Sequence, residues 1–269
     1  MAGVTGRTRL LGLIADPVVQ ARSPGLGNAL LEQRGQGGAF VLVPMQVPDG
    51  ALVAVVAALR RIGNLDGAIV SMPHKSAIVP LLDELTPDAA MIGAVNVVRR
   101  TAEGRLVGTT LDGEGFVAGL RGAGHEVRGA ACLLVGAGGA ASAIAFELVR
   151  HGCASLTIVN RTASRAADLA ARVRSAFPGA AVRPGEAGDD ARYDVAINGT
   201  PLGMRPGDEL PMSRDMVARA TLVAECVLAP EMTELLTLAA ASGSAVHTGI
   251  AMLDAQMSLI LDFMGVPGR

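Results

Sequence analysis

The 269-residue sequence predicts an α/β fold with two domains built on parallel, doubly wound sheets. Short apolar runs alternate with helix-like segments along the chain, which is typical of parallel strands covered by helices. One of these runs ends in a glycine-rich turn that leads into a helix-like segment. With 50% hydrophobic residues, the chain has enough apolar side chains to bury the cores of two modest domains.

The part of the chain before residue 124 predicts alternating strands and helices. Ser23-Pro24 is typical of a helix start, with Ser23 as the N-cap and Pro24 at the first helical position. Short apolar runs indicate strands, and runs with a helical period indicate helices. The expected elements, in order, are a strand at 9–15, a helix from 24 to 33, a strand at 39–44, a helix at 49–62, a strand at 67–71, a helix at 75–82, a hairpin of 94–98 with 106–110, and a helix at 112–123.

The segment 131–141 carries the clearest local motif. Its uninterrupted apolar run, 131–135, predicts a parallel strand buried on both faces. Gly136, Gly138 and Ala141 then fill the pattern G-x-G-x-x-G/A, which combines a tight turn, close backbone approach to a pyrophosphate and close packing of the next helix. The N-terminus of that helix favours an anion. The residues expected to bind a dinucleotide here are Gly136, Ala137, Gly138, Gly139 and Ala140.

The charge at the end of the next strand indicates which dinucleotide binds. The strand expected at 156–159 leads into Asn160, Arg161 and Thr162. A site for NAD usually has an acidic residue near this point to bind the ribose 2′-hydroxyl. Here Asn160 is neutral, and Arg161 and Arg165 suit a 2′-phosphate. We therefore expect NADP, held in part by Asn160, Arg161, Thr162 and Arg165; the alternative is a glycine-rich turn followed by a solvated arginine pair.

The rest of the chain continues the alternation of strands and helices. Because the glycine-rich motif begins near residue 131, the first 113 residues are expected to form a separate domain that carries the substrate. The remaining expected elements are a helix at 164–177, strands near 182 and at 195–198, 221–227 and 245–248, and helices at 233–241 and 254–265.

Composition and charge exclude several classes of protein. The net charge is −2 and no basic stripe with interleaved aromatics occurs, which argues against a nucleic-acid partner. No window approaches 18 apolar residues and no signal-peptide pattern is present, so a cytoplasmic protein without membrane spans is expected. Cys132 and Cys226 lie in apolar runs and are expected to be reduced, buried thiols. The scattered His125, His151 and His247 show no metal-ligand spacing, and no metal is expected.

Two side chains are candidates for proton transfer. Lys75 follows a buried strand, at the sheet edge where α/β proteins bind ligands. Asp112 lies at the end of the connection between the domains. A lysine and an aspartate that meet in a cleft form an acid–base pair in which the carboxylate orients the ammonium. Two solvated surface charges are the alternative. His74, beside Lys75, is assigned no role.

These segments together resemble the shikimate dehydrogenase family along nearly the whole chain. No single match is decisive, but the matches occur in the order found in that family. They are Ser23-Pro24 with Asn28, Pro73-His74-Lys75, Gly93-Ala94-Val95-Asn96, Asp112-Gly113 with Gly115, the turn 136–141, Asn160-Arg161-Thr162 with Arg165, Asn198-Gly199-Thr200 with Gly203-Met204, Pro230 with Thr233 and Leu235-Leu236, and Gly249, Met252-Leu253 and Gln256.

The resemblance implies an NADP-dependent oxidoreductase of aromatic amino acid biosynthesis that reversibly reduces 3-dehydroshikimate to shikimate. It implies an N-terminal α/β substrate domain at 1–113, a Rossmann-type domain at 114–248, and a C-terminal helix at 249–269 that returns to the first domain. The protein is expected to be a monomer or a homodimer. By resemblance, Lys75 and Asp112 are catalytic. The substrate-binding positions are Ser23, Ser71, Asn96 and Gln256, and Thr200 and Gly249 join the cofactor-binding residues.

Several positions depart from the family pattern. Ala21 replaces a serine, Ile69 replaces an asparagine and Leu228 replaces a tyrosine, while Thr110-Leu111 replaces Asn-Thr before Asp112. Each lost hydrogen bond to a bound polar ligand costs roughly 0.5–3 kcal/mol. The alternatives are therefore a related enzyme for quinate, aminoshikimate or a less hydroxylated acid, or a non-catalytic NADP-binding regulator.

Overall fold

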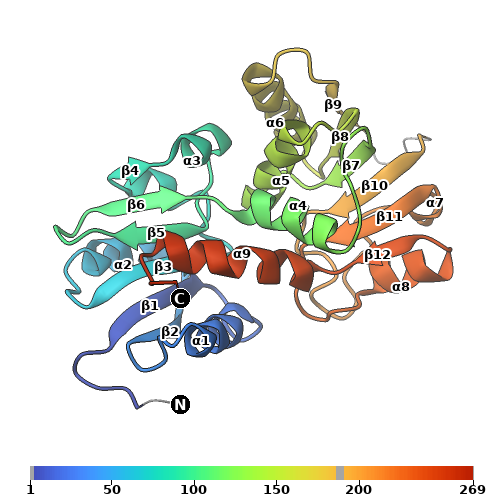
Figure 1. The fold of residues 1–269 in the computed structure, drawn as a ribbon. Helices are drawn as coiled ribbons and strands as arrows, with labels where there is room; N and C mark the ends of the chain where they lie inside the picture. Colours follow the sequence, from blue (N-terminus) through green and yellow to red (C-terminus); the bar gives the residue numbers. More distant parts are fainter. Residues whose placement is uncertain (1–2, 186–190, 269) are drawn as a thin grey trace. The chain divides into compact units, whose positions relative to one another are not determined.

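The computed structural model describes residues 3–185 and 191–268, and the chain divides into two compact units. Unit 1 comprises Met1–Leu111 and Gln256–Arg269, and unit 2 comprises Asp112–Ala255. Helix α9 (Gly249–Phe263) therefore contributes residues to both units (Figure 1). Within the described ranges, each helix is too short or too polar to span a membrane.

Unit 1 contains a six-stranded mixed sheet in the order β2-β1-β3-β5-β6-β4. Strand β1 runs parallel to β2 and β3, whereas β5 runs antiparallel to β3 and β6. The expected hairpin is thus confirmed, and it makes the sheet of this unit mixed, with parallel strands on one side of β3 and the antiparallel β5 on the other. The strands are β1 (Arg9–Ala15), β2 (Phe40–Gln46), β3 (Leu65–Val70), β4 (Glu84–Leu85), β5 (Val97–Arg100) and β6 (Leu106–Thr109).

The helices of unit 1 differ from the expected ones at their ends. Helix α1 (Ser23–Gln33) begins at Ser23 itself, so the expected N-cap role of Ser23 is wrong. Arg22 occupies the N-cap position with helical backbone angles and makes no side-chain cap bond. Asn28 instead ties α1 to β2, because its side chain exchanges two 2.9 Å hydrogen bonds with the backbone of Leu42. The other elements are the 3-10 turn η1 (Asp49–Ala51), α2 (Leu52–Leu59), the 3-10 turn η2 (Val79–Leu81), α3 (Pro87–Ile92) and part of α9.

The helix expected at 75–82 is wrong, and α3 was not expected. Turns follow β3, and only η2 has helical backbone, because Pro80 provides no N–H and restricts the residue before it. Helix α3 has a recognisable start. Thr86 is its N-cap and accepts a 3.3 Å hydrogen bond from Ala89 N, and Pro87 occupies the first turn. The same Ser/Thr-Pro pattern that drew attention to Ser23 therefore marks α3 correctly.

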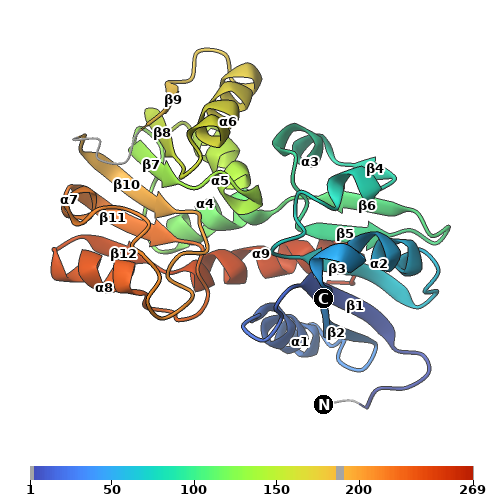
Figure 2. The same cartoon turned by 180° about the vertical axis from the view of Figure 1, so that it is seen from behind.

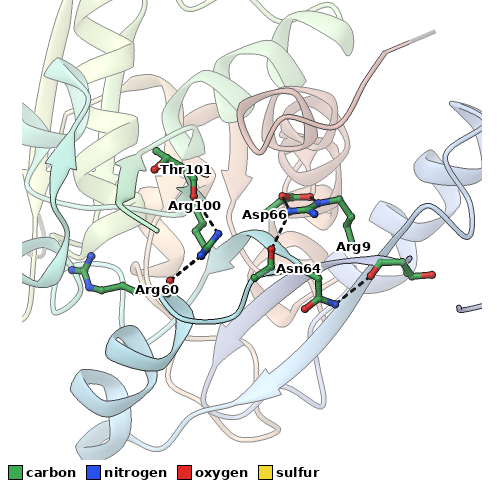
Figure 3. A network of polar contacts seen from close by, with 8 residues as sticks. Arg9, Arg60, Asn64, Asp66, Arg100 and Thr101 are labelled. Atoms are coloured by element: carbon green, nitrogen blue, oxygen red, sulfur yellow. Dashed lines mark hydrogen bonds and ion pairs between the residues drawn. The ribbon is translucent and has the colours of Figure 1, made fainter. Parts of the chain in front are cut away.

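The amino edge of the unit 1 sheet is held by arginine contacts. Figure 3 shows Arg9, at the start of β1, against the carboxylate of Asp66 on β3. In the same network Arg100 donates to the carbonyl of Arg60 through Nε and Nη2, at 3.1 and 3.0 Å. This polar network lies at the edge opposite to the strand ends that precede Ser71.

The C-terminal part of α9 completes the core of unit 1. Met257, Ile260, Leu261 and Met264 are each at most 2% exposed. A Cβ atom placed on Gly67 of β3 would lie 2.7 Å from Cγ of Met264, so the helix packs closely on the sheet. Met257 and Met264 therefore belong to the core of unit 1.

Unit 2 contains a six-stranded, wholly parallel sheet in the order β12-β11-β10-β7-β8-β9. Taken from β7, this is the doubly wound order that reverses direction between β7 and β10. Figure 2 shows α5 and α6 on one side of the sheet, with α7 and α8 on the other. The Rossmann-type expectation is confirmed. The strands are β7 (Ala131–Val135), β8 (Ser155–Val159), β9 (Val182–Pro184), β10 (Tyr193–Asn198), β11 (Ala220–Glu225) and β12 (Ala245–His247).

The helices of unit 2 follow the expected alternation, with two differences. Helix α7 was not expected, although Ser213 caps it with a 3.2 Å bond from Met216 N, and α9 begins five residues before the expected 254. Cys132 is buried as expected, but Cys226 is only partly buried because β11 ends one residue earlier. The helices are α4 (Asp112–Gly122), α5 (Gly139–Arg150), α6 (Ala163–Ala176), α7 (Arg214–Ala218), α8 (Glu234–Ala241) and the first residues of α9.

Candidate active site

The carboxyl ends of β1 and β3 bring two connecting segments side by side in unit 1. Ser71 N donates to the carbonyl of Ile14 at 2.8 Å, and Asp16 N donates to the carbonyl of Met72 at 3.0 Å. Both strands end at the same edge of the sheet, and these backbone bonds hold Ser71 there at a partly buried position.

The turn after Ser71 presents Lys75. His74 is fully buried, and its Nε2 lies 2.7 Å from the carbonyl oxygen of Val47. The carbonyl of Lys75 accepts a 2.8 Å hydrogen bond from Val95 N. The backbone on both sides of the amine-bearing side chain is therefore anchored, and His74 has a structural role. Lys75 is also the only lysine among the 269 residues, since the other basic side chains are all arginine or histidine.

Asn96 and Gln256 are brought into direct contact in unit 1. Asn96 is 2% exposed and its Nδ2 donates to Oε1 of Gln256 at 3.1 Å. Its Oδ1 accepts from Leu111 N at 2.8 Å, which fixes the orientation of the amide. Residues 160 positions apart thus meet beside the turn that carries Lys75, because Val95 N bonds the carbonyl of Lys75. Ser23, the remaining expected substrate residue, is buried at the start of α1.

Asp112 is the first residue of α4 and belongs to unit 2. It is 3% exposed. Gly113 beside it allows a close helix contact, since a Cβ atom at that position would lie 2.3 Å from the carbonyl oxygen of Ala143 on α5. The start of α4 is therefore pressed against α5, which fixes Asp112 within its unit. Lys75 belongs to unit 1, and its pairing with Asp112 stays a prediction.

The glycine-rich turn after β7 has the geometry that anion binding requires. Gly136 has a φ of 121°, a conformation that residues with a side chain rarely adopt. Gly138 is the N-cap of the 12-residue helix α5 and offers no side chain of its own, so the first N–H groups of the helix remain accessible to a ligand. Ala141 is fully buried. The residues 136–140 can therefore hold a pyrophosphate, as the motif predicts.

An exposed basic cluster follows the neighbouring strand. Val135 and Val159 are register partners on β7 and β8, so the segments after them lie side by side. Asn160 Nδ2 donates to the carbonyl of Thr162 at 3.0 Å, which shapes the turn before α6. Arg161 and Arg165 are both exposed there. Two guanidinium groups beside the phosphate turn, with a neutral amide in place of a carboxylate, fit a 2′-phosphate.

The ends of β10 and β11 lie at the same carboxyl edge of the unit 2 sheet as the phosphate turn and the arginine cluster. Asn198 is fully buried, and its Oδ1 accepts from N and Oγ1 of Thr200 at 3.0 and 2.7 Å. Gly249, at the start of α9, lies so close to the chain that a Cβ atom on it would be 2.4 Å from the carbonyl oxygen of Val227. Thr200 follows β10, and Gly249, which follows the edge strand β12, packs on the segment after β11; their role in cofactor binding stays a prediction.

Glu225, at the end of β11, was missed by the sequence analysis. It is fully buried, and burial raises the pKa of its carboxyl to about 7. Its signal in the sequence was a single acidic residue inside the apolar run 222–228, where a charged side chain in an expected buried strand is unusual. His125 and His247, which are far apart in sequence, were also not expected to meet, yet their ring centroids are 6.3 Å apart.

Two family models match the chain. Residues 13–98 match the shikimate dehydrogenase substrate binding domain, and residues 121–180 match shikimate / quinate 5-dehydrogenase. A shikimate dehydrogenase (NADP(+)) of Rubrobacter xylanophilus is 39% identical over 93% of this chain and 88% of its own length. One of Methanopyrus kandleri, with the same name, is 34% identical over 96% of this chain and 91% of its own length.

Solved structures are similar over the whole chain. A shikimate dehydrogenase in complex with NADP+ has a TM-score of 0.90 at 29% identity, covering 99% of this chain and 93% of its own. The shikimate 5-dehydrogenase of Thermus thermophilus, in complex with NADP(H) and shikimate, has a TM-score of 0.85 at 28% identity and covers 97% and 95%. With the motifs, the strand order and these relatives in agreement, the chain belongs to the shikimate dehydrogenase family.

Proposed function

We propose that this protein is an NADP-dependent dehydrogenase that reversibly reduces 3-dehydroshikimate to shikimate. The proposal rests on two sets of residues in one chain. Unit 1 brings Asn96 and Gln256 together beside the turn that carries Lys75, and unit 2 has a phosphate turn next to an arginine cluster. The relatives named above act with NADP(+), which agrees with the basic cluster at Arg161 and Arg165.

In the proposed reaction, bound NADPH supplies a hydride to the substrate carbonyl. The ammonium of Lys75 donates a proton to the oxygen that becomes the alcohol, and the carboxylate of Asp112 orients that ammonium. Ser23, Ser71, Asn96 and Gln256 bind the hydroxyl and carboxylate groups of the substrate. In the oxidative direction Lys75 takes the proton back. Such an arrangement needs fixed donors, and the backbone bonds at Ser71 and Lys75 supply that rigidity.

The departures at Ala21, Ile69 and Leu228 predicted an altered substrate or a regulator. The comparisons favour shikimate, because relatives that match along almost the whole chain carry the name shikimate dehydrogenase (NADP(+)). Ile69 also has a structural explanation, since it lies inside β3 and is 5% exposed. A cytoplasmic location and a monomeric or homodimeric state stay predictions.

The direct test is an assay of purified protein with NADP+ and each of shikimate, quinate and aminoshikimate, followed by the absorbance of NADPH. We expect the highest kcat/KM with shikimate. A preference for quinate or aminoshikimate would reject the proposed substrate. NADPH binding without turnover of any of the acids would favour a regulator instead.

Replacing Arg161 by alanine is expected to weaken NADP+ binding by about 10- to 100-fold. The reason is the loss of a charge-assisted contact to the 2′-phosphate, worth about 1.5–3 kcal/mol. The affinity for NAD+, measured by calorimetry alongside NADP+, should change little. Arg192→Ala is the matched control, because Arg192 is exposed before β10, at the other end of the sheet. Equal losses for the two nucleotides would show that Arg161 does not contact the 2′-phosphate.

A further inference from the structure

The carboxyl of Glu225 lies in a buried polar cluster that the proposed reaction does not use. Glu225 ends β11 and is the register partner of Asn198, which ends β10. Both side chains are fully buried. Burying polar side chains costs free energy unless they form hydrogen bonds. The hydrogen bonds of these two side chains therefore decide how they can be buried at the sheet edge expected to bind the cofactor.

The hydrogen bonds of Asn198 fix which way its amide faces. Its Oδ1 must be the acceptor toward Thr200, because the backbone N–H of Thr200 can only donate. Its Nδ2 then donates to the carbonyl of Leu202 at 3.0 Å and to Oε2 of Glu225 at 3.4 Å. The amide therefore holds the turn after β10 on one side and Glu225 on the other.

The two oxygens of Glu225 have different surroundings. Oε2 accepts from Asn198 and also from Oγ1 of Thr233 at 3.1 Å; Thr233 Oγ1 in turn accepts from Leu236 N at the start of α8. Oε1 is enclosed and, among the residues that the structure describes, has no hydrogen-bond partner. An ionised carboxylate spreads its charge over both oxygens and needs donors for both. One oxygen that accepts twice and one without a partner favour the neutral carboxylic acid with its proton on Oε1, because an unpaired buried hydroxyl costs much less than an unpaired buried charge.

The turn that Asn198 holds is packed directly on the phosphate turn. A Cβ atom on Gly136 would lie 3.0 Å from the carbonyl carbon and oxygen of Gly199, and 3.1 Å from Cγ2 of Thr200. Gly199 N also donates to the carbonyl of Val135 at 2.8 Å. A displacement of the turn after β10 would therefore be transmitted to Gly136 by contact.

We infer that Glu225 is a positioning residue for cofactor binding: its neutral carboxyl holds Asn198, and through it Gly199 and Thr200, against the phosphate turn. The inference rests on the proposed NADP-dependent function. Loss of the proton places a buried negative charge beside Asn198, where no described residue offers Oε1 a donor. The carboxylate must then turn or admit water, and the amide of Asn198 loses its fixed position. Cofactor affinity should fall as the group ionises.

Charged neighbours do not explain the neutral state. The charged or titratable side chains on the adjoining segments are Arg205, Asp208 and Glu209 in the loop after β10, Cys226 and Glu231 in the loop after β11, Glu234 at the start of α8 and His247 on β12. None of them contributes to the raised pKa of Glu225, which comes from burial and is opposed by the bonds from Thr233 and Asn198. The ionisation of Glu225 is thus set by its enclosure and should be visible as a single titration.

The test measures the affinity for NADPH by its fluorescence, without substrate, at several pH values in wild type, Glu225→Gln and Glu225→Ala. Glutamine keeps the acceptor oxygen and stays neutral. We expect the wild-type Kd to rise by up to about tenfold for each pH unit above 7 relative to that of Glu225→Gln, which should bind like wild type near pH 6. Glu225→Ala should bind several-fold more weakly at all pH values. Its KM for NADP+ should rise more than its kcat falls.

Glu231→Gln is the control, because Glu231 is exposed in the loop after β11. Circular dichroism shows whether Glu225→Ala folds. If it does not fold, the comparison of wild type with Glu225→Gln still tests the role of Glu225. Identical pH profiles for these two proteins, with NADPH bound by both, would overturn the role of Glu225 and leave the proposed function intact. Failure of the wild type to bind NADPH at any pH would overturn both.

Discussion

Replacing Lys75 by methionine is expected to lower kcat for shikimate oxidation by about 100- to 10,000-fold, the usual contribution of a general acid or base. Methionine keeps most of the length of the side chain but cannot transfer a proton. The backbone of the turn should not change, because the carbonyl of residue 75 still accepts from Val95 N and buried His74 still bonds Val47. NADPH affinity and the melting temperature should therefore match those of the wild type.

The matched control is Ser76→Ala, an exposed neighbour in the same turn, which should keep wild-type kcat. Because Lys75 is the only lysine, the prediction has a second, independent test in the unmutated protein. Acetylation with a lysine-directed reagent can modify only this side chain and the N-terminal amine. It should abolish turnover, and bound shikimate should slow the loss. Full activity of Lys75→Met, or of fully acetylated protein, would disprove the proposed proton transfer.

Replacing Glu225 by glutamine is expected to remove a pH-dependent contribution of up to about 3 kcal/mol to the free energy of unfolding. The pKa of Glu225 rises from 4.5 to about 7 on folding, because burial penalises the charged form. Between these values the folded state binds more protons than the unfolded state, so the contribution of Glu225 to stability is fully present below 4.5. It is lost as pH rises toward 7, and above that pH it no longer changes. Each pKa unit corresponds to about 1.4 kcal/mol.

Urea unfolding of wild type and Glu225→Gln, near pH 5 and near pH 8, isolates this contribution. Other titrating groups are shared by the two proteins and cancel in the difference. The variant should gain stability relative to the wild type as the pH rises. A difference between the two proteins that stays constant with pH would show that Glu225 is not neutral in the folded protein.

The fold was predictable where one local rule dominates. The apolar run 131–135, the glycines after it and the alternation of strands and helices all predict a parallel sheet with a strand–turn–helix unit, and the sheet of unit 2 agrees with them. The sequence alone did not reveal that β5 also pairs antiparallel with β3, because that pairing depends on residues about 30 positions apart in the chain. The helix expected at 75–82 failed because Pro80 outweighed a weak apolar period.

The candidate site was predictable to a different degree in each part. The phosphate turn follows from residues adjacent in sequence, as does the cluster at Arg161. The contact of Asn96 with Gln256 joins residues 160 positions apart, and only resemblance to a family suggested that both bind substrate. Glu225 was missed because its importance arises from Asn198 and Thr233, which meet it only in the folded sheet.

Unit 1 is assembled from both extremities of the sequence, and this has a consequence for biosynthesis. Gln256, which bonds Asn96, and Met264, which covers Gly67, leave the ribosome some 150 residues after the last strand of that unit. Unit 2 is continuous from Asp112 to Ala255 and can close as soon as it emerges. Unit 1 therefore cannot complete its core until the residues of α9 have been synthesised, whereas unit 2, the part expected to bind the nucleotide, has all of its residues before then.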